Sequence, residues 1–302
     1  MRLLVTGREG QIARSLVERG PGREIEVTTL GLPAFDLAGP GNSIVAQIDD
    51  SRPDIIVSAA AYTQVDQAES ERELAFAVNE HGVAAVARAA RGLGIPLIHL
   101  STDYVFDGRK AEPYVETDST APTGVYGSSK LAGEKAALME NDNCAILRTA
   151  WVYSPFGANF VKTMLRLAET RDEVGVVEDQ RGNPTSALDI ADAIFAVAEN
   201  LISGKAPEHR GVFHMTAAGE ATWADLASAA FEASAQAGGP SARVKRITTA
   251  DFPTPAKRPA NSRLDCSKLA RDHGVRLPDW RESLQVVVER LVRTGAPGAV
   301  IR

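Results

Sequence analysis

A tyrosine and a lysine four residues apart, Tyr126 and Lys130, follow the turn-forming segment 121–124. At this spacing both side chains lie on one face of a helix, which we predict to begin at about residue 125. A phenol has a reference pKa of about 10, and a nearby ammonium group favours the phenolate and lowers that pKa. The pair could therefore give a proton to a developing alkoxide. As an isolated pair it could equally be a packed aromatic ring beside a solvated charge.

Hydroxyl and carboxyl groups follow an apolar run upstream of this pair, where residues 97–100 lead into Ser101, Thr102 and Asp103. If the run is a central strand, these groups lie at its carboxyl end, where open α/β sheets bind their ligands. The sequence therefore predicts a polar site close to the tyrosine and the lysine.

A glycine turn follows the first apolar run of the chain, residues 3–5. The turn consists of Gly7, Arg8, Glu9, Gly10, Gln11, Ile12 and Ala13, in the pattern G-x-x-G-x-x-A. A dinucleotide needs glycine here so that backbone N–H groups and a helix N-terminus can approach its pyrophosphate. The pattern departs from G-x-G-x-x-G, and glycine-rich turns are common between strands and helices. Its position in an alternating α/β pattern favours cofactor binding.

The end of the second predicted strand bears on the choice of cofactor. In NAD enzymes an acidic residue about 20 positions after the turn holds the ribose 2′-hydroxyl. Here residues 28–31 contain no acid, and Arg8 lies inside the glycine turn. Arg8 would attract the 2′-phosphate of NADPH, and no carboxylate would repel it. We therefore predict NADPH as the cofactor, with NADH possible. Arg8 could also be a solvated surface residue.

The elements that must position these residues follow from the apolar pattern. Short runs rich in Ile, Val and Leu predict strands at 3–5, 25–27, 55–57, 97–100 and 145–147. Helix-length segments separate them, 71–91 among these, as expected for strands buried on both faces. The fold class is therefore α/β, a Rossmann-type doubly wound parallel sheet.

In the second half of the chain, strands and helices no longer alternate regularly. Predicted helices lie near 159–170, 186–203, 222–237 and 281–293, and 252–259 is a Pro-rich loop. We predict an NAD(P)-binding domain at 1–150, with part of 175–215 returning to the sheet. Residues 151–302 would mainly form a smaller, mostly helical substrate-binding lobe.

Composition excludes several classes of protein. The 302 residues are 44% hydrophobic and 24% charged, which is typical of globular chains. A net charge of −6 without a long run of Lys or Arg makes nucleic acid an unexpected partner. Cys144 and Cys266 lack a C-x-x-C partner, which suits packed thiols in a reducing cytosol. No secretory signal and no apolar stretch of about 20 residues is present, so we expect a cytoplasmic protein without a membrane segment.

The motifs together resemble a known group of enzymes, the extended short-chain dehydrogenases/reductases, and within it the family that reduces dTDP-4-dehydrorhamnose, over nearly the whole chain. The likeness is carried by residues 7–13, 59–66, 101–108, 126–134, 148–153, 179–185 and 258–264. The resemblance implies NADPH-dependent reduction of the 4-keto group of dTDP-4-dehydro-β-L-rhamnose to dTDP-L-rhamnose.

The resemblance also implies roles for individual residues. Tyr126 would protonate O4 while hydride reaches C4, Lys130 would bind the nicotinamide ribose and lower the Tyr126 pKa, and Thr102 would orient the carbonyl. Further cofactor contacts would be Gly10, Gln11 and Ile12 at the pyrophosphate, Asp36 and Leu37 on the adenine side, and Ala61, Tyr62 and Thr63 beside the cofactor.

Substrate contacts implied by the resemblance are Thr102, Asp103 and Trp151. Without the resemblance, Trp151 would be read as a core aromatic. The basic loop with Arg258, Asn261 and Arg263 could hold the nucleotide diphosphate by bidentate hydrogen bonds, or be a solvated Pro-rich linker.

Two departures from the family pattern matter. Ala13 replaces the third glycine, which should weaken helix packing only slightly. Some relatives dimerise around magnesium held by glutamates, but the aligned positions here are Ser15, Leu188 and Arg290. Because a hard cation needs oxygen ligands, we expect no metal site and no metal-bridged dimer, and predict a monomer or weak dimer.

Alternative functions remain at this stage. Another nucleotide-sugar 4-ketoreductase, a 4,6-dehydratase or an epimerase would use the same Tyr126 and Lys130. Dehydratases of this group place Asp-Glu after the threonine, whereas here Asp103 and Tyr104 follow Thr102. A non-catalytic regulatory subunit is a further alternative, against which the retained tyrosine, lysine and threonine argue.

Overall fold

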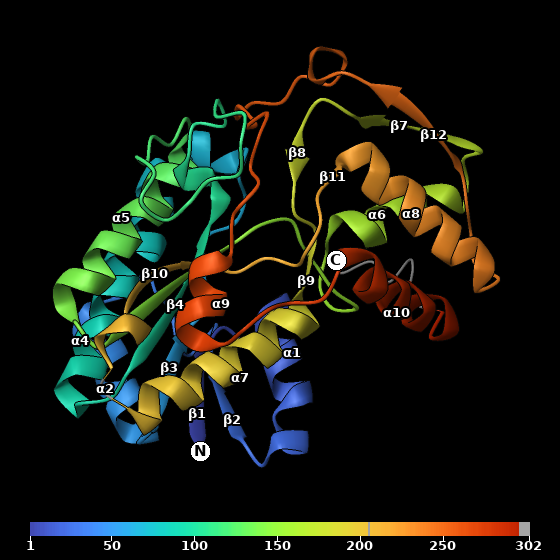
Figure 1. Ribbon diagram of the computed structural model, residues 1–302. Coiled ribbons are helices and arrows are strands. Elements are labelled where there is room, and N and C mark those ends of the chain that lie inside the picture. Colours follow the sequence, from blue (N-terminus) through green and yellow to red (C-terminus); the bar gives the residue numbers. More distant parts are fainter. Residues whose placement is uncertain (205, 296–302) are drawn as a thin grey trace.

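A computed structural model describes residues 1–204 and 206–295. Its centre is a six-stranded parallel sheet with the order β10-β5-β4-β3-β1-β2 (Figure 1). The strands are β1 (Arg2–Thr6), β2 (Glu26–Leu30), β3 (Ile55–Ser58), β4 (Leu97–Thr102), β5 (Cys144–Thr149) and β10 (Gly211–His214). The predicted doubly wound parallel sheet is confirmed.

Helices cover both faces of this sheet, which explains the continuous apolar runs. Leu3 and Val5 of β1 face a core shared with α1 and α7, whereas Leu4 faces a core shared with α2 and α4. Figure 1 shows α2, α4 and α5 on one side of the sheet and α1 and α7 on the other. The helices are α1 (Gln11–Arg19), α2 (Gly41–Ser51), α3 (Arg72–Phe76), α4 (Val83–Leu93), α5 (Val125–Glu140) and α7 (Ala187–Ser203).

The helix predicted at 71–91 is divided in the structure. A π-helical turn, Ala77–Gly82, separates α3 from α4. It carries the buried Asn79, whose side chain bonds to both backbone polar groups of Tyr62 and donates to Ser129 Oγ at 2.9 Å. The π-helical turn places Asn79 in contact with residues far away in the sequence. The spacing of apolar residues therefore could not predict it.

The second half of the chain supplies β10 and α7 to the sheet and builds a further lobe. Its helices are α6 (Phe160–Ala168), α8 (Trp223–Gln236), α9 (Ser267–His273) and α10 (Trp280–Arg293). Three pairs of short strands complete it: β6 (Val152–Tyr153) with β9 (Thr185–Ser186), β7 (Glu173–Val177) with β12 (Arg243–Ile247), and β8 (Arg181–Gly182) with β11 (Ala221–Thr222). The four helices predicted here are present, whereas α9 and the strand pairs were not predicted. The end of the predicted lobe, 296–302, and residue 205 lie outside the described residues.

Short 3₁₀ turns link these elements. They are η1 (Pro21–Arg23), η2 (Gln67–Glu69), η4 (Asp103–Val105), η5 (Pro207–His209) and η6 (Thr249–Asp251). In the described part of the chain, no helix combines the length and apolar character needed to cross a membrane. Cys144 and Cys266 are both free thiols, the first buried in β5 and the second partly buried.

A crossing segment, residues 256–264, joins the two lobes. Its backbone bonds to Gly108 through Asn261 N–H at 3.2 Å and to Arg181 through Ser262 N–H at 2.8 Å. Gly108 has φ +75°, and a Cβ there would lie 2.4 Å from Pro259. Only glycine allows the loop after β4 to pass this close to the crossing segment.

Candidate active site

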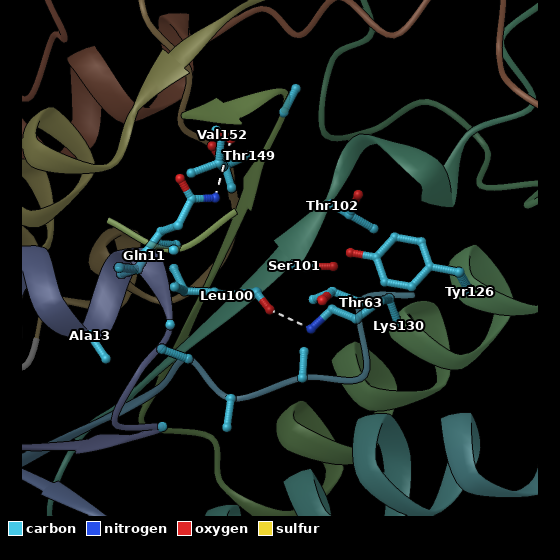
Figure 2. A pocket seen from close by; sticks show the side chains of 18 of the residues that line it. Gln11, Ala13, Thr63, Leu100, Ser101, Thr102, Tyr126, Lys130, Thr149 and Val152 are labelled. Atoms are coloured by element: carbon cyan, nitrogen blue, oxygen red, sulfur yellow. Dashed lines mark hydrogen bonds between the residues drawn. The ribbon is translucent and has the colours of Figure 1, made fainter. Parts of the chain in front are cut away.

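A cavity of about 570 Å³ opens at the carboxyl ends of β1, β3, β4 and β5. Figure 2 shows the side chains around it. The predicted site residues that line it are Gly7, Gly10, Gln11, Ile12, Ala61, Thr63, Thr102, Asp103, Tyr126, Lys130 and Trp151. The structure therefore brings the glycine turn, the end of β4 and the Tyr-x-x-x-Lys pair to one place.

The glycine turn is shaped for a close backbone approach. Gly7 has φ +101°, which disfavours any side chain, and its N–H donates to Leu30 O at 2.6 Å. Gly10 is the N-cap of α1, makes no side-chain cap, and has open space where a Cβ would lie. The uncapped N-terminus of α1 therefore presents N–H groups at the cavity, which suits an anion such as a pyrophosphate.

Gln11 has a structural task within the turn. Its side-chain oxygen accepts from Ser154 Oγ at 2.8 Å and from Asn159 Nδ2 at 3.0 Å, and its amide donates to Val152 O at 3.3 Å. These contacts hold the start of α1 against the loop that closes the far side of the cavity. Ala13 is buried in the core beneath the turn, as its small size allows.

Four predicted cofactor residues do not line the cavity. Arg8 and Asp36 are exposed, and the Asp36 carboxylate accepts from Ala38 N–H at 2.9 Å. Leu37 is buried, and the Tyr62 hydroxyl donates to Glu71 at 2.9 Å. Glu9, which the sequence analysis gave no role, does line the cavity.

Gly31, at the end of β2, packs against the glycine turn. A Cβ at this position would lie 3.0 Å from the backbone nitrogen of Arg8 and 3.1 Å from its Cβ. The turn therefore leaves little room for a side chain at the position after β2.

The Tyr126 hydroxyl points toward the end of β4, where Ser101 and Thr102 lie (Figure 2). Lys130 is buried one turn further along α5, and its Nζ donates to Leu100 O at 2.6 Å. Thr102 Oγ1 donates to Asp103 Oδ1 at 2.9 Å and accepts from Tyr104 N–H at 3.2 Å. The hydroxyl groups of Tyr126 and Thr102 thus face the same part of the cavity.

Burial dominates the electrostatics of this group. It raises the pKa of Tyr126 to about 12, against a hydrogen bond with Thr102 that lowers it, and the charge of Asp103 raises it further. Burial also lowers the pKa of Lys130 to about 8, which the charge of Glu134 opposes. Lys130 is not among the groups that shift the pKa of Tyr126, and desolvation of the phenolate outweighs the hydrogen bond with Thr102, so the pKa is raised and not lowered as expected. Tyr126 is therefore protonated at neutral pH, as a proton donor must be.

A buried ion pair lies beneath the catalytic face of α5. Glu134 follows Lys130 by one helical turn and accepts from Arg148 Nε at 2.8 Å and from Arg148 Nη2 at 2.7 Å. Ser101 Oγ also donates to this carboxylate. The pair joins α5 to β4 and β5, and sequence spacing offered no sign of the contact with Arg148.

Asp103 is a buried carboxyl at the cavity wall. Burial raises its pKa to about 6, against the hydrogen bonds with Thr102 and Ser262 that lower it. Trp151 stands on the same wall with a positive φ of 48°. Its indole stacks on Trp223, with ring centroids 3.6 Å apart and planes 6° apart.

The basic loop does not line the cavity. Arg258 Nη2 donates to Asp66 at 2.7 Å, and its charge opposes the rise in the pKa of Tyr104 that burial causes. Asn261 donates to Lys110 O and Glu112 O, and its oxygen accepts from Arg263. Arg263 also pairs with Glu220 at 2.5 Å. The polar groups of Asn261 and Arg263 are therefore already used within the crossing segment and its neighbours.

The positions aligned with the relatives' magnesium ligands have other contacts. Ser15 is buried and donates to Gln11 O at 2.8 Å, and Leu188 is buried. Arg290 makes two hydrogen bonds to Glu18, at 2.6 and 2.7 Å. Within 1–204 and 206–295, no three His, Cys, Asp or Glu side chains gather where they could hold a metal ion.

Comparison with known proteins agrees with this arrangement. The family model described as the RmlD substrate binding domain matches residues 1–293. The dTDP-4-dehydrorhamnose reductase of Sinorhizobium fredii (strain NBRC 101917 / NGR234) is 53% identical over 295 residues, covering 98% of this chain and 99% of that protein.

Two solved structures support the same assignment. The dTDP-4-dehydrorhamnose reductase of Clostridium acetobutylicum has a TM-score of 0.89 at 35% identity, covering 96% of this chain and 99% of that one. The enzyme of that name from Bacillus anthracis, in complex with NADP, has a TM-score of 0.86 at 34% identity, covering 95% and 98%. This chain therefore belongs to the dTDP-4-dehydrorhamnose reductase family.

Proposed function

We propose that the protein reduces the 4-keto group of dTDP-4-dehydro-β-L-rhamnose with NADPH, giving dTDP-L-rhamnose. One observation carries the proposal: Tyr126, Lys130 and Thr102 share a cavity with the glycine turn, in a chain 53% identical to a protein of that activity. The neighbouring relative in complex with NADP supports the choice of cofactor.

The residues around the cavity fit a dinucleotide. Gly7, Gly10 and the N-terminus of α1 would hold the pyrophosphate, and Arg8 would attract a 2′-phosphate. Asp36 and Leu37 would border the adenine, with 61–63 along the nicotinamide half. When bound, the reduced dinucleotide supplies a hydride to the substrate carbonyl carbon.

Side chains of this protein would supply the proton and orient the carbonyl oxygen. Thr102, whose hydroxyl donates to Asp103 in this structure, would turn that proton to the substrate and orient the carbonyl, and Tyr126 would give its proton to the oxygen as negative charge develops there. Burial of Tyr126 keeps that proton in place until the oxygen becomes basic enough to take it. The ammonium of Lys130 binds the nicotinamide ribose and favours the phenolate left behind.

The substrate wall is proposed to include Asp103, Trp151 and Arg258. Asp103 and Trp151 line the cavity, whereas Arg258 lies outside its lining and acts through its charge on Tyr104, which lines it. Asn261 and Arg263 would act indirectly, by holding the crossing segment that carries Arg258. A dehydratase is disfavoured because Tyr104 stands where its second acid would be needed.

The organisation of the molecule follows from this proposal. Residues 1–150, with α7 and β10, would form the cofactor-binding unit, and most of 151–302 would select the sugar nucleotide. Because Arg290 and Leu188 offer no carboxylate, we propose a monomer or weak dimer without bridging metal. We propose that the enzyme is cytoplasmic.

The deciding experiment mixes purified protein, NADPH and enzymatically generated dTDP-4-dehydrorhamnose, and follows the absorbance of the reduced cofactor. We expect consumption of one NADPH for each dTDP-L-rhamnose formed. Absence of oxidation with that substrate would refute the proposed reaction. Activity on other 4-keto sugar nucleotides, tested in parallel, would redirect the assignment to another ketoreductase.

A further inference from the structure

The backbone of Trp151 adopts a left-handed conformation, with φ 48°. In the described part of the chain, the other non-glycine residues with positive φ are Glu24, which ends the 3₁₀ turn η1, and Arg52, which ends helix α2. Trp151 ends no helix; it stands between β5 and β6. A bulky residue keeps this conformation only where its surroundings impose it, and such residues gather at functional sites.

Three contacts impose the position of the Trp151 indole. It stacks on Trp223 at 3.6 Å between centroids, and its Nε1 donates to Ser262 Oγ at 3.2 Å. A Cβ on Gly182 would lie 2.4 Å from Cε2 of the same ring, so β8 touches the indole directly. The ring is therefore confined by α8, by β8 and by the crossing segment.

Trp223 is itself well anchored. It is the first residue of α8, directly after Thr222, which forms a capping box with Asp225. Its Nε1 donates to Gln180 Oε1 at 3.2 Å, and Phe160 packs against its ring at 4.6 Å between centroids. Trp223 is absent from the cavity lining, whereas Trp151 forms part of it. In this structure Trp223 therefore reaches the cavity through Trp151.

We propose that Trp223 is a positioning residue for substrate recognition: by stacking on Trp151 it fixes a flat aromatic wall against which the deoxysugar part of the substrate binds. The inference rests on the proposed function for the identity of the sugar. An indole face offers a broad apolar surface, which suits the C–H face and methyl group of a 6-deoxyhexose. The glycine turn runs from the end of β1 into α1 at another part of the same cavity, so we expect cofactor binding to depend on this wall less than sugar binding does.

The test compares Trp223→Leu, which fills space without a flat ring, with Trp223→Phe, which retains one. Calorimetry would measure binding of dTDP-L-rhamnose, of dTDP alone and of NADPH. We expect Trp223→Leu to weaken dTDP-L-rhamnose binding about five- to tenfold, as loss of an aromatic pair predicts. Binding of dTDP and NADPH should change less than about twofold, and Trp223→Phe should stay close to the wild type.

If the wild type reduces the keto sugar nucleotide, steady-state kinetics gives a second measurement. Trp223→Leu should raise KM for the keto sugar nucleotide with a smaller change in kcat. Trp151→Phe combined with Trp223→Leu should cost less than the sum of the single changes, because both act on one ring. Additive effects would contradict the proposal.

Gly182→Ala changes a residue of β8 that contacts the same ring. It is the alternative test if Trp223→Leu does not fold. Its added methyl must displace the Trp151 indole, so it should also weaken dTDP-L-rhamnose binding and spare dTDP. Wild-type affinity for dTDP-L-rhamnose in a folded variant overturns the inference, as does an equal loss for dTDP or NADPH. A different result is that the wild type fails to reduce the keto sugar nucleotide while Trp223→Leu still selectively loses affinity for dTDP-L-rhamnose. That result would refute the proposed reaction and leave the role of Trp223 supported.

Discussion

Glu134 and Arg148 form a two-pronged ion pair, at 2.8 and 2.7 Å, with both side chains almost wholly buried. Glu134 lies on the helix that carries Tyr126 and Lys130, and Arg148 on the strand beside the one that carries Thr102. The pair therefore fixes the helix of the proposed proton donor to the strands that lead to Thr102.

Replacing one member of this pair should be costly. Glu134→Gln leaves the guanidinium of Arg148 buried without its counter-charge, and we expect the free energy of unfolding to fall by about 3–5 kcal/mol in urea titrations. The exposed pair Arg243 and Glu173 is the control, because Glu173→Gln should change stability by less than about 1 kcal/mol. Equal effects of the two substitutions would contradict this account.

Tyr126→Phe removes the proposed proton donor and keeps the ring. We expect kcat to fall by a factor of about 10² to 10⁴, as for loss of a general acid, with little change in NADPH affinity. Tyr114→Phe is a matched control, since the Tyr114 hydroxyl bonds to Asp107 and Tyr114 does not line the cavity. If Tyr126→Phe retained wild-type turnover, the proton would have to come from another group.

The pH dependence of the reaction should show the loss of the proton from Lys130. Burial lowers its pKa to about 8, so its ammonium is present below that pH and is lost as the pH rises through it, while Tyr126 stays protonated to about pH 12. We expect kcat/KM for NADPH, which reflects the free enzyme, to decline above about pH 8. In Lys130→Arg the decline should disappear, whatever the absolute rate, because a guanidinium keeps its proton. A wild-type profile that is flat to pH 10 would argue against this reading.

Arg8 should set the preference between cofactors. Removing the exposed guanidinium in Arg8→Ala should lower the ratio of kcat/KM for NADPH to that for NADH by about tenfold, because one charge contact to a phosphate is lost. Arg19→Ala, at the far end of α1, should leave the ratio unchanged. A wild-type enzyme that already prefers NADH would show that the glycine turn was misread.

Local signals in the sequence predicted the sheet and the centre of the site. Runs such as 3–5 and 55–57 form strands because both their faces are covered, and helical spacing alone places Tyr126 and Lys130 together. The sequence could not predict contacts between distant segments. The pair Glu134 and Arg148, and the stack of Trp151 on Trp223, exist only after the strands and lobes have assembled.

The electrostatic expectation for Tyr126 failed for a related reason. Spacing gives the distance along a helix, but not the depth at which the helix is buried. Burial raises the pKa of Tyr126, and the Lys130 ammonium donates to Leu100 O; neither fact follows from the order of residues. The basic loop likewise suggested anion binding, whereas Asn261 and Arg263 are engaged by neighbouring loops.

The close packing of Gly31 on Arg8 bears on attempts to re-engineer cofactor use. An acidic residue grafted after β2 would place its first side-chain carbon 3.0 Å from the backbone of the turn. Such a graft requires the turn proposed to hold the pyrophosphate to shift by a few tenths of an ångström. A redesign toward NADH therefore has to change the turn and the strand end together.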